Sequence, residues 1–298
     1  MSVAARRTRP DDWLAVEALC RRARRKLPRL WWWEEHLADD LFVLTEHDGV
    51  VTGALFAWPD ESPVAWIRLA ALDDGLDAAE WLDLALPPIL DKLRCHGAQK
   101  LAWMDYDRWA GPHLRSFGFG RLTEVITLVK SSRALPDVRA IDAYLRPASD
   151  ADVPAVVAID QATFTPHWWH SESTLLRRTA TSSHFVVAEV ADGVVGYFEG
   201  EHHPPVAHLN RIAVHPARQG QGIGALLLRH ALRTFWRLGA GQITLNTQTD
   251  NDYSRRLYRR FGFEPTGDAA TVWELDLSEE EACPENIDHR KSGASRTR

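Results

Sequence analysis

The chain has 298 residues, with 35 Lys and Arg against 41 Asp and Glu, a formal net charge of −6 and a pI near 6.1. A chain that is 26% charged and 45% hydrophobic is neither disordered throughout nor a basic nucleic-acid coat. At about 100 to 200 residues per domain, the length predicts two domains. Its 13 tryptophans are unevenly spread, with nine before residue 138 and four after it.

The predicted elements of the second half alternate strands and helices. Ser149 and Asp150 offer N-caps for the first helix, and Asp192-Gly193 is a two-residue hairpin signal. In chain order we expect a strand at 143–146, a helix at 150–162, strands at 184–190, 193–201 and 207–214, a helix at 222–238, a strand at 242–246, a helix at 251–261 and a strand at 271–277. This order predicts a mixed sheet with helices on both faces.

Four sequence features recur in the same order, 137 to 144 residues apart. They are Arg9-Pro10 and Arg146-Pro147, Trp31-Trp32 of Trp31-Trp32-Trp33 and Trp168-Trp169 of His167-Trp168-Trp169, Phe42-Val43 and Phe185-Val186, and Phe117-Gly118-Phe119 and Phe261-Gly262-Phe263. We infer an ancestral duplication. The expected domains are residues 1–135 and 143–277, joined by a linker at 136–142 and followed by a disordered tail at 278–298.

The cysteines and the N-terminal residues predict a cytoplasmic protein. Cys20, Cys95 and Cys283 are widely separated and form no C-x-x-C pair, so neither a disulfide framework nor a cysteine zinc site is expected. Charged residues occupy positions 6–12, where a signal peptide needs an apolar core. No apolar run reaches about 18 residues, so no membrane segment is expected.

A glycine-rich segment follows the strand predicted at 207–214. Gly220, Gly222 and Gly224 let the backbone take unusual dihedrals and let a ligand approach the main chain closely. Because the segment opens a helix, its free N–H groups and the helix dipole converge on one point. The spacing is neither that of a dinucleotide fingerprint nor that of a P-loop. The loop therefore predicts a ligand with a phosphate or pyrophosphate group.

Two motifs of the second half resemble the signatures of the GNAT acyltransferase superfamily. Gln219, Gly222 and Gly224 match its acetyl-CoA signature, Q/R-x-x-G-x-G/A. Residues 251–258, which read N-D-Y-S-R-R-L-Y, resemble its second signature, N-x-x-A/S-x-x-L-Y, and lead into Phe261-Gly262-Phe263. Both occur in the family's order and spacing, and the resemblance covers about residues 142–277.

The resemblance implies a fold, an acyl donor and a set of site residues. The implied fold class is α/β (an α+β mixed sheet) with two tandem GNAT-like domains, each a mixed, mostly antiparallel sheet flanked by helices. Tyr258 stands at the family's position for the group that protonates the departing thiolate, and the N–H of Val214 at the position that polarises the thioester oxygen. The implied donor is acetyl-CoA, bound by Ala213, Val214, Gln219, Gly220, Gln221, Gly222, Ile223, Gly224, Asn251, Ser254 and Tyr258.

The motifs do not fix which residue takes the proton from the attacking amine. His208 stands eleven residues before Gln219, where one branch of the family carries its catalytic glutamate, and an imidazole titrates near neutral pH. Glu201 lies in an acidic and histidine-rich cluster on the preceding strand and would act through water. The carboxylate that the ribosomal-protein branch carries on the next strand is replaced here by Asn246.

A segment rich in tryptophan and histidine lies where GNAT enzymes form the wall that binds the acceptor. It consists of His167, Trp168, Trp169 and His170. Its indoles either stack on an apolar or cationic part of the acceptor or hold the two halves of the chain together. Since no third ligand at a usable spacing accompanies the histidines, no metal site is expected.

The first half resembles a GNAT domain that has lost its donor site. Aligning the repeats places Asp77 at the position of Gly220 and Trp81 at that of Gly224, where a carboxylate and an indole would repel and obstruct a pyrophosphate. The expected role of this copy is to shape the acceptor cleft. The basic run at residues 21–26 is expected to end a solvated helix, so no nucleic-acid partner is expected.

Together, these features predict an acetyl-CoA-dependent N-acetyltransferase that moves an acetyl group to a primary amine by direct attack in a ternary complex. The expected acceptor is a small molecule or a peptide N-terminus, and the chain is expected to be a monomer or a homodimer. Two alternatives remain. The tandem plan is similar to that of a small-molecule amine acyltransferase of the mycothiol synthase type, and the chain could instead be a non-catalytic acyl-CoA-binding sensor.

Overall fold

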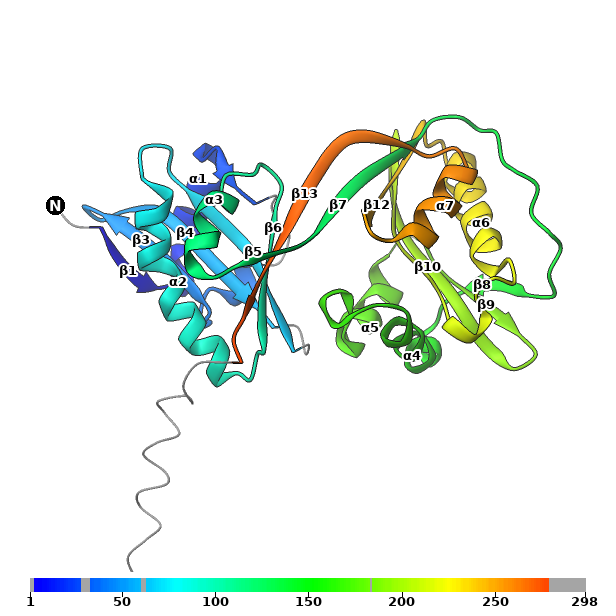
Figure 1. The fold of residues 1–298 in the computed structure, drawn as a ribbon, viewed down its shortest axis with the longest axis horizontal. Helices are drawn as coiled ribbons and strands as arrows, with labels where there is room; N and C mark the ends of the chain where they lie inside the picture. Colours follow the sequence, from blue (N-terminus) through cyan, green and yellow to red (C-terminus); the bar gives the residue numbers. More distant parts are fainter. Residues whose placement is uncertain (1–2, 28–32, 60–62, 183, 279–298) are drawn as a thin grey trace, which may run out of the picture. The chain divides into compact units, whose positions relative to one another are not determined.

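The chain divides into two compact units. The computed structural model describes residues 3–27, 33–59, 63–182 and 184–278 (Figure 1). Unit 1 combines Met1–Leu122 with Ala270–Arg298, and unit 2 is Thr123–Ala269. Trp31, Trp32 and all of the expected tail except Ser278 lie outside the described residues.

The strands of unit 1 are hydrogen-bonded in the order β1-β3-β4-β5-β6-β13, in which only β5 and β6 are parallel. Its strands are β1 (Ala4–Arg7), β3 (Phe42–His47), β4 (Val50–Trp58), β5 (Val64–Leu72), β6 (Lys100–Asp105) and the end of β13 (Glu264–Asp276), with the short β2 (Arg25–Lys26) beside β5. Its helices are α1 (Trp13–Arg22), α2 (Ala78–Cys95) and α3 (Gly111–Leu114).

Unit 2 repeats this plan with the sheet order β7-β12-β11-β10-β9-β8, in which only β11 and β12 are parallel. Its strands are β7 (Gly120–Lys130), β8 (Tyr144–Pro147), β9 (His184–Val190), β10 (Gly193–His203), β11 (Val206–Val214) and β12 (Gln242–Gln248). Its helices are α4 (Val153–Thr163), α5 (Glu172–Thr181), α6 (Ile223–Arg237) and α7 (Asp252–Arg260). The expected class, mixed and mostly antiparallel strands flanked by helices, is confirmed.

Most predicted elements of the second half are present within a few residues of their expected ends. The hairpin at Asp192-Gly193 joins β9 and β10, with Gly193 paired to Val190. Helix α5 was not predicted, because only Leu175 of its ten residues is buried and no apolar period marks it. Strand β13 begins at Glu264, well before the expected residue 271.

An ion-pair network at the start of each unit supports the duplication. In unit 1, Arg6 pairs with Asp12 at 2.7 Å and with Glu46 at 2.6 Å. The same network recurs in unit 2 as Arg146, Asp152 and Glu189. The hydrogen bond from the arginine lowers the pKa of Asp12 and of Asp152. Both networks fix the first strand of a unit to the turn that starts its first helix.

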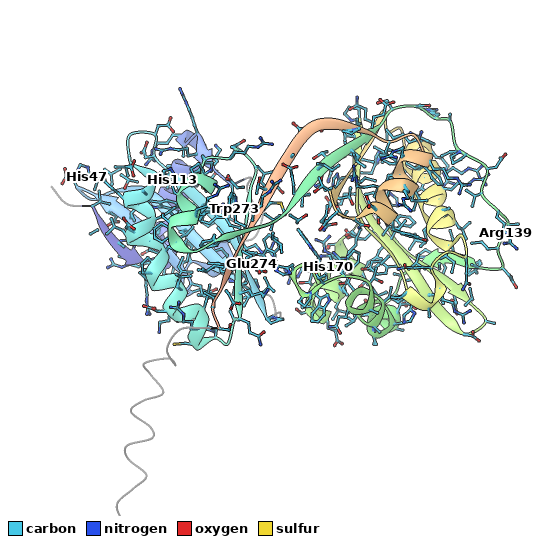
Figure 2. All side chains as sticks on the ribbon, viewed as in Figure 1. His47, His113, Arg139, His170, Trp273 and Glu274 are labelled. Carbon is cyan, nitrogen blue, oxygen red and sulfur yellow. The ribbon has the colours of Figure 1, made fainter. Side chains whose placement is uncertain are left out.

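The compact units do not follow the boundaries expected from the repeat. Residues 125–130 of β7, from the first repeat, pair with β12 in unit 2. Residues 271–276 of β13, from the second repeat, pair with β6 in unit 1, and Figure 2 labels Trp273 and Glu274 on this part of the strand. Each sheet therefore contains a strand that the other repeat supplies.

The segment between the repeats is packed against unit 2 rather than free. Leu135, Val138 and Ile141 contact the apolar cluster beneath α6 and α7, and Arg260 donates a hydrogen bond of 2.6 Å to the carbonyl of Asp137. Figure 1 shows this segment passing beside α6. Residues 135–141 thus form part of the structure that surrounds α6 and α7.

Helices cover both faces of the unit 2 sheet. One apolar cluster joins the sheet to α6 and α7, and a second joins it to α4 and α5.

Among the described residues, no helix is long and apolar enough to cross a membrane. Cys95 takes part in a disulfide, which the wide spacing of the cysteines did not lead us to expect.

Candidate active site

The two parallel strands of unit 2 separate at their carboxyl ends. β11 pairs with β12 over Val206–Leu209 and Gln242–Leu245, although β11 continues to Val214 and β12 to Gln248. Beyond the paired residues, the facing edges of both strands leave the ladder, and their backbone N–H and C=O groups need other partners. A ligand with an extended polar chain can therefore enter the opening and pair with a strand edge.

The backbone of Val214 is directed toward this opening. The N–H of His215 donates to the carbonyl of Val195 on the β10 side at 2.9 Å. Because successive N–H groups alternate between the two edges of a strand, the N–H of Val214 faces the opposite side, where the strands separate. The Val214 carbonyl accepts hydrogen bonds from Gln219 Nε2 at 3.0 Å and Thr163 Oγ1 at 3.3 Å.

The loop from β11 to α6 leaves the first turn of the helix open. Gly220 and Gly222 have φ values of +74° and +95°, which L side chains rarely adopt. Gly222 is the N-cap of α6, and no side chain caps this helix. The N–H groups of the first turn therefore remain available to an anionic ligand, with the helix dipole in support.

A cavity of about 200 Å³ lies at this junction within unit 2. Nine of the eleven residues expected to bind the donor line it; of the other two, Gly222 caps α6 and Gln221 lines a separate cavity. The lining residues come from the end of α4, the end of β11, the glycine loop and α7: Thr163, Phe164, Ile212, Ala213, Val214, Arg218, Gln219, Gly220, Ile223, Gly224, Asn251, Tyr253, Ser254, Leu257 and Tyr258.

Six lining residues were not expected from the motifs. Tyr253 and Leu257 lie inside the second motif, so its spacing could have included them. Arg218 and Ile212 adjoin the predicted donor residues. Thr163 and Phe164 end α4, some fifty positions earlier, and no local pattern links that helix to the glycine loop. Only the packed fold brings them to the cavity.

Tyr258 supplies a hydroxyl to the cavity wall. Asn251 caps α7 by accepting a hydrogen bond from the N–H of Ser254 at 3.1 Å. Tyr258 lies one helical turn after Ser254 and two turns after the cap. Its side chain is buried, with the ring against Phe263. Burial raises the pKa of the phenol well above its usual value, so Tyr258 keeps its proton throughout the physiological range.

A buried ion pair ties the segment after α4 to β11. Asp160, which is fully buried in α4, accepts hydrogen bonds from Arg211 Nε at 2.6 Å and from the backbone N–H of His170 at 3.0 Å, and also from the hydroxyl of Tyr197. Arg211 also donates to the carbonyl of Trp168. Figure 2 shows His170 on the connection toward α5. Residues 167–170 are thus held at β11, close to where the strands separate, although they do not line the cavity.

A comparison with protein families connects this geometry to a known class. A model of the acetyltransferase (GNAT) family matches residues 153–263, which include the splayed strand, the glycine loop, α6 and α7. Residues 153–263 are therefore similar to the GNAT family over about a third of the chain. The matched residues include every residue that lines the cavity in unit 2.

Two relatives align with different parts of this chain. The mycothiol acetyltransferase of Nocardia farcinica is 25% identical over 248 residues, which cover 75% of this chain and 79% of that protein. The N-alpha-acetyltransferase RimI of Mycobacterium tuberculosis is 39% identical over 89 residues, which cover 28% of this chain and 54% of that protein. The first alignment therefore extends over both repeats, whereas the second is short.

Solved structures share the tandem GNAT fold along most of the chain. A tandem GNAT protein from the clavulanic acid biosynthesis pathway is 14% identical, with a TM-score of 0.64, and covers 94% of this chain and 99% of its own. A GCN5-related N-acetyltransferase from Sphaerobacter thermophilus is 17% identical, with a TM-score of 0.65, covering 92% and 96% respectively.

The structure does not bring His208 and Glu201 to the cavity described above. These two residues pair across β10 and β11, and His208 lies six positions before Val214, about 20 Å along the strand. His208 Nδ1 is 2.7 Å from Thr244 Oγ1. Burial lowers the pKa of His208, against the opposing influence of Glu201 and Glu199. The imidazole is therefore uncharged at neutral pH, but it does not line the cavity that contains Tyr258.

Glu199 holds the end of α5 to a bulge in β11. The register shift beside Glu199 leaves Asn210 as an extra residue on β11. Glu199 is almost fully buried, and its Oε1 accepts hydrogen bonds from Ser182 Oγ at 2.6 Å, Arg178 Nη1 at 2.8 Å and Asn210 Nδ2 at 2.9 Å.

In the described part of the chain, no group of three or more His, Cys, Asp or Glu is placed to hold a metal ion.

The helix of unit 1 that corresponds to α6 has a capped N-terminus. Asp77 is the N-cap of α2, and its carboxylate accepts hydrogen bonds from the N–H groups of Ala79 at 2.8 Å and Glu80 at 3.1 Å. The structural counterpart of Asp77 is thus the N-cap Gly222, not Gly220 as the repeat alignment placed it. The alignment shifts because the loop after β5 is shorter than the loop after β11. A carboxylate occupies the N–H groups that an anion would need.

Trp81 also lies deeper than the alignment indicated. It sits one turn inside α2 and is 2% exposed, so it does not block the loop itself. Its ring packs 6.0 Å from that of Trp109, which is 5.9 Å from Trp103 on β6. A Cβ added at Gly53 would lie 2.2 Å from Trp81 Nε1. Three indoles therefore pack in the apolar core beside α2, where they account for part of the tryptophan excess of the first half.

Proposed function

We propose that this chain is a GNAT acyltransferase that moves an acetyl group from acetyl-CoA to a primary amine by direct attack in a ternary complex, within unit 2. One observation supports the proposal most directly. A single cavity collects the uncapped glycine loop at α6, the end of β11 and the buried hydroxyl of Tyr258. An anion site, a polar strand edge and a proton donor are the three groups that a CoA thioester needs.

Each of these groups has a distinct role in the proposal. The N–H groups at the start of α6 bind the pyrophosphate of acetyl-CoA, which supplies the acetyl group as a thioester. The N–H of Val214 donates a hydrogen bond to the thioester oxygen and stabilises the charge that develops there during attack. Tyr258, whose hydroxyl is protonated before the reaction, donates its proton to the departing thiolate, and its phenolate then recovers a proton from the water that took up the proton of the amine. The corresponding helix end in unit 1, the N-terminus of α2, is instead capped by Asp77.

The acceptor amine is proposed to lose its proton to water. Of the residues that line the cavity in the described chain, none is a carboxylate or an imidazole. The rate should therefore follow the free amine, rising with pH up to the amine's own pKa. The test is to measure kcat/KM against pH for two acceptors of different amine pKa. The acid limb of the profile should lie at higher pH for the acceptor with the higher amine pKa. His208→Gln and Glu201→Gln should leave that limb in place; a limb that either variant flattens would show that side chain to be the base.

The acceptor class rests on the relatives. The alignment with the mycothiol acetyltransferase extends over both repeats and favours a small-molecule amine. The shorter alignment with RimI favours a peptide N-terminus. A panel of amino sugars, amino thiols and peptides, assayed for release of the CoA thiol, distinguishes the two classes.

Binding and turnover together test the proposal. Calorimetry should show that acetyl-CoA binds, and at least one amine class should release the thiol. Failure to bind acetyl-CoA would contradict the proposal outright. Binding without thiol release across the whole panel would instead favour a non-catalytic sensor of acyl-CoA.

The Tyr258→Phe variant should lower turnover by about tenfold to a hundredfold. A general acid contributes about 10²-fold or more in typical enzymes, and a thiolate needs less help because it is a comparatively good leaving group. Donor affinity should change by less than about threefold, since the ring remains in the cavity wall. Steady-state rates and calorimetry separate the two effects, and unchanged turnover would remove the assigned role.

A further inference from the structure

Arg218 lies between two cavities of unit 2. It lines the donor cavity beside Gly220, and it also lines a second cavity of about 260 Å³ formed with the hairpin at Asp192 and the segment around Ile141. Its guanidinium forms an ion pair with Asp192. The donor motif does not include Arg218, because it precedes the first fixed position of that motif.

The Arg218–Asp192 pair is exposed and therefore weak. The side chain of Arg218 is 37% exposed and that of Asp192 is 73% exposed. Exposed pairs of this kind shift an equilibrium by only about two- to fivefold. A guanidinium forms stronger, bidentate hydrogen bonds with a phosphate group. A pyrophosphate at the loop would therefore outcompete Asp192 for Arg218.

A backbone donor of the same loop is held in a similar way. The N–H of Gly220 donates to the hydroxyl of Tyr253 at 3.3 Å, which is a long hydrogen bond. Tyr253 is 59% exposed and lines the donor cavity. One side-chain donor and one backbone donor of the loop thus have exposed, replaceable partners.

We propose that Arg218 is a side-chain ligand of the donor's pyrophosphate and that Asp192 holds it beside the loop until the donor binds. Donor binding then exchanges the Arg218–Asp192 pair for an Arg218–phosphate contact. This inference rests on the proposed use of a CoA thioester. Asp192 acts as a positioning residue at the tip of the β9–β10 hairpin. Because its carboxylate competes with the pyrophosphate for Arg218, it lowers the affinity of the loop for the donor.

Calorimetry with coenzyme A and with pantetheine, which lacks the pyrophosphate, tests this inference. Asp192→Asn should tighten coenzyme A binding about two- to fivefold at low salt and leave pantetheine binding unchanged. Asparagine suits the turn as well as aspartate does, so the hairpin should persist. Arg218→Met should weaken coenzyme A binding about tenfold, again without affecting pantetheine.

The double variant separates the proposed exchange from simple charge repulsion. If Asp192 acts through Arg218, adding Asp192→Asn to Arg218→Met should change coenzyme A affinity no further. A tightening that persists in the Arg218→Met background, or one that appears equally with pantetheine, would overturn the inference. If the wild type binds pantetheine as tightly as coenzyme A, the result contradicts this inference but not the proposed donor site. If it binds neither compound, the proposed function fails.

Discussion

A fragment spanning residues 143–277 is expected not to fold cooperatively, although it contains the whole second repeat. It lacks β7, the partner of β12 in unit 2, together with the buried Leu128. It also carries residues 271–276 of β13 without their partner β6. An unpaired apolar strand and an open sheet edge favour aggregation over folding.

The fragment 123–269 is the matched comparison. It contains the whole of unit 2, including β7 and the segment with Leu135, Val138 and Ile141 that packs against α6 and α7. Circular dichroism during thermal unfolding should show a cooperative transition for 123–269 and none for 143–277. Cooperative unfolding of both fragments at similar temperatures would mean that the repeat boundary, not the compact unit, defines the folding domain.

Gly222→Trp is expected to weaken acetyl-CoA binding at least a hundredfold, which corresponds to about 3 kcal/mol. Gly222 caps α6 with a φ of +95°, and only Ile141 lies within 4 Å of the place of its missing Cβ. An indole there would project over the N–H groups of the first helical turn. The measurement is a calorimetric titration with acetyl-CoA at constant salt.

Gly239→Trp controls for backbone strain. Gly239 has a φ of +92° and open space around its missing Cβ, and it follows the opposite end of α6, about 25 Å away. Each variant should lose about 1–2 kcal/mol of stability for placing an L residue at positive φ. Only Gly222→Trp should lose donor binding. Equal losses of binding, or intact binding in Gly222→Trp, would argue against a donor site at α6.

The local part of the site was predictable from the sequence. The glycine loop and the motif at Asn251 each lie within a dozen residues and impose their own geometry, a positive-φ turn and a capped helix. Both therefore reach the cavity where the motifs placed them. Tyr258 follows its cap by two helical turns, so its position was fixed by the helix alone.

Features that depend on long-range packing were not predictable in the same way. The pairing of Lys130 with Ile243 joins segments more than a hundred residues apart. The sequence of an apolar strand does not specify which other strand it pairs with. The sequence distance from His208 to Gln219 matches that of a catalytic base in one branch of the family. On the extended strand, however, the six positions between His208 and Val214 separate them by about 20 Å. The shift of Asp77 to a helix cap arose from a difference in loop length that an ungapped comparison does not reveal.

The reciprocal exchange of β7 and β13 between the repeats bears on how the gene can change. After a duplication, a spare copy is normally free to be deleted or to recombine with other genes. Here a deletion of the first copy also removes a strand of the second copy's sheet, and the reverse holds as well. Selection that retains the second copy therefore preserves the first copy as well, even while the residues of the first copy diverge.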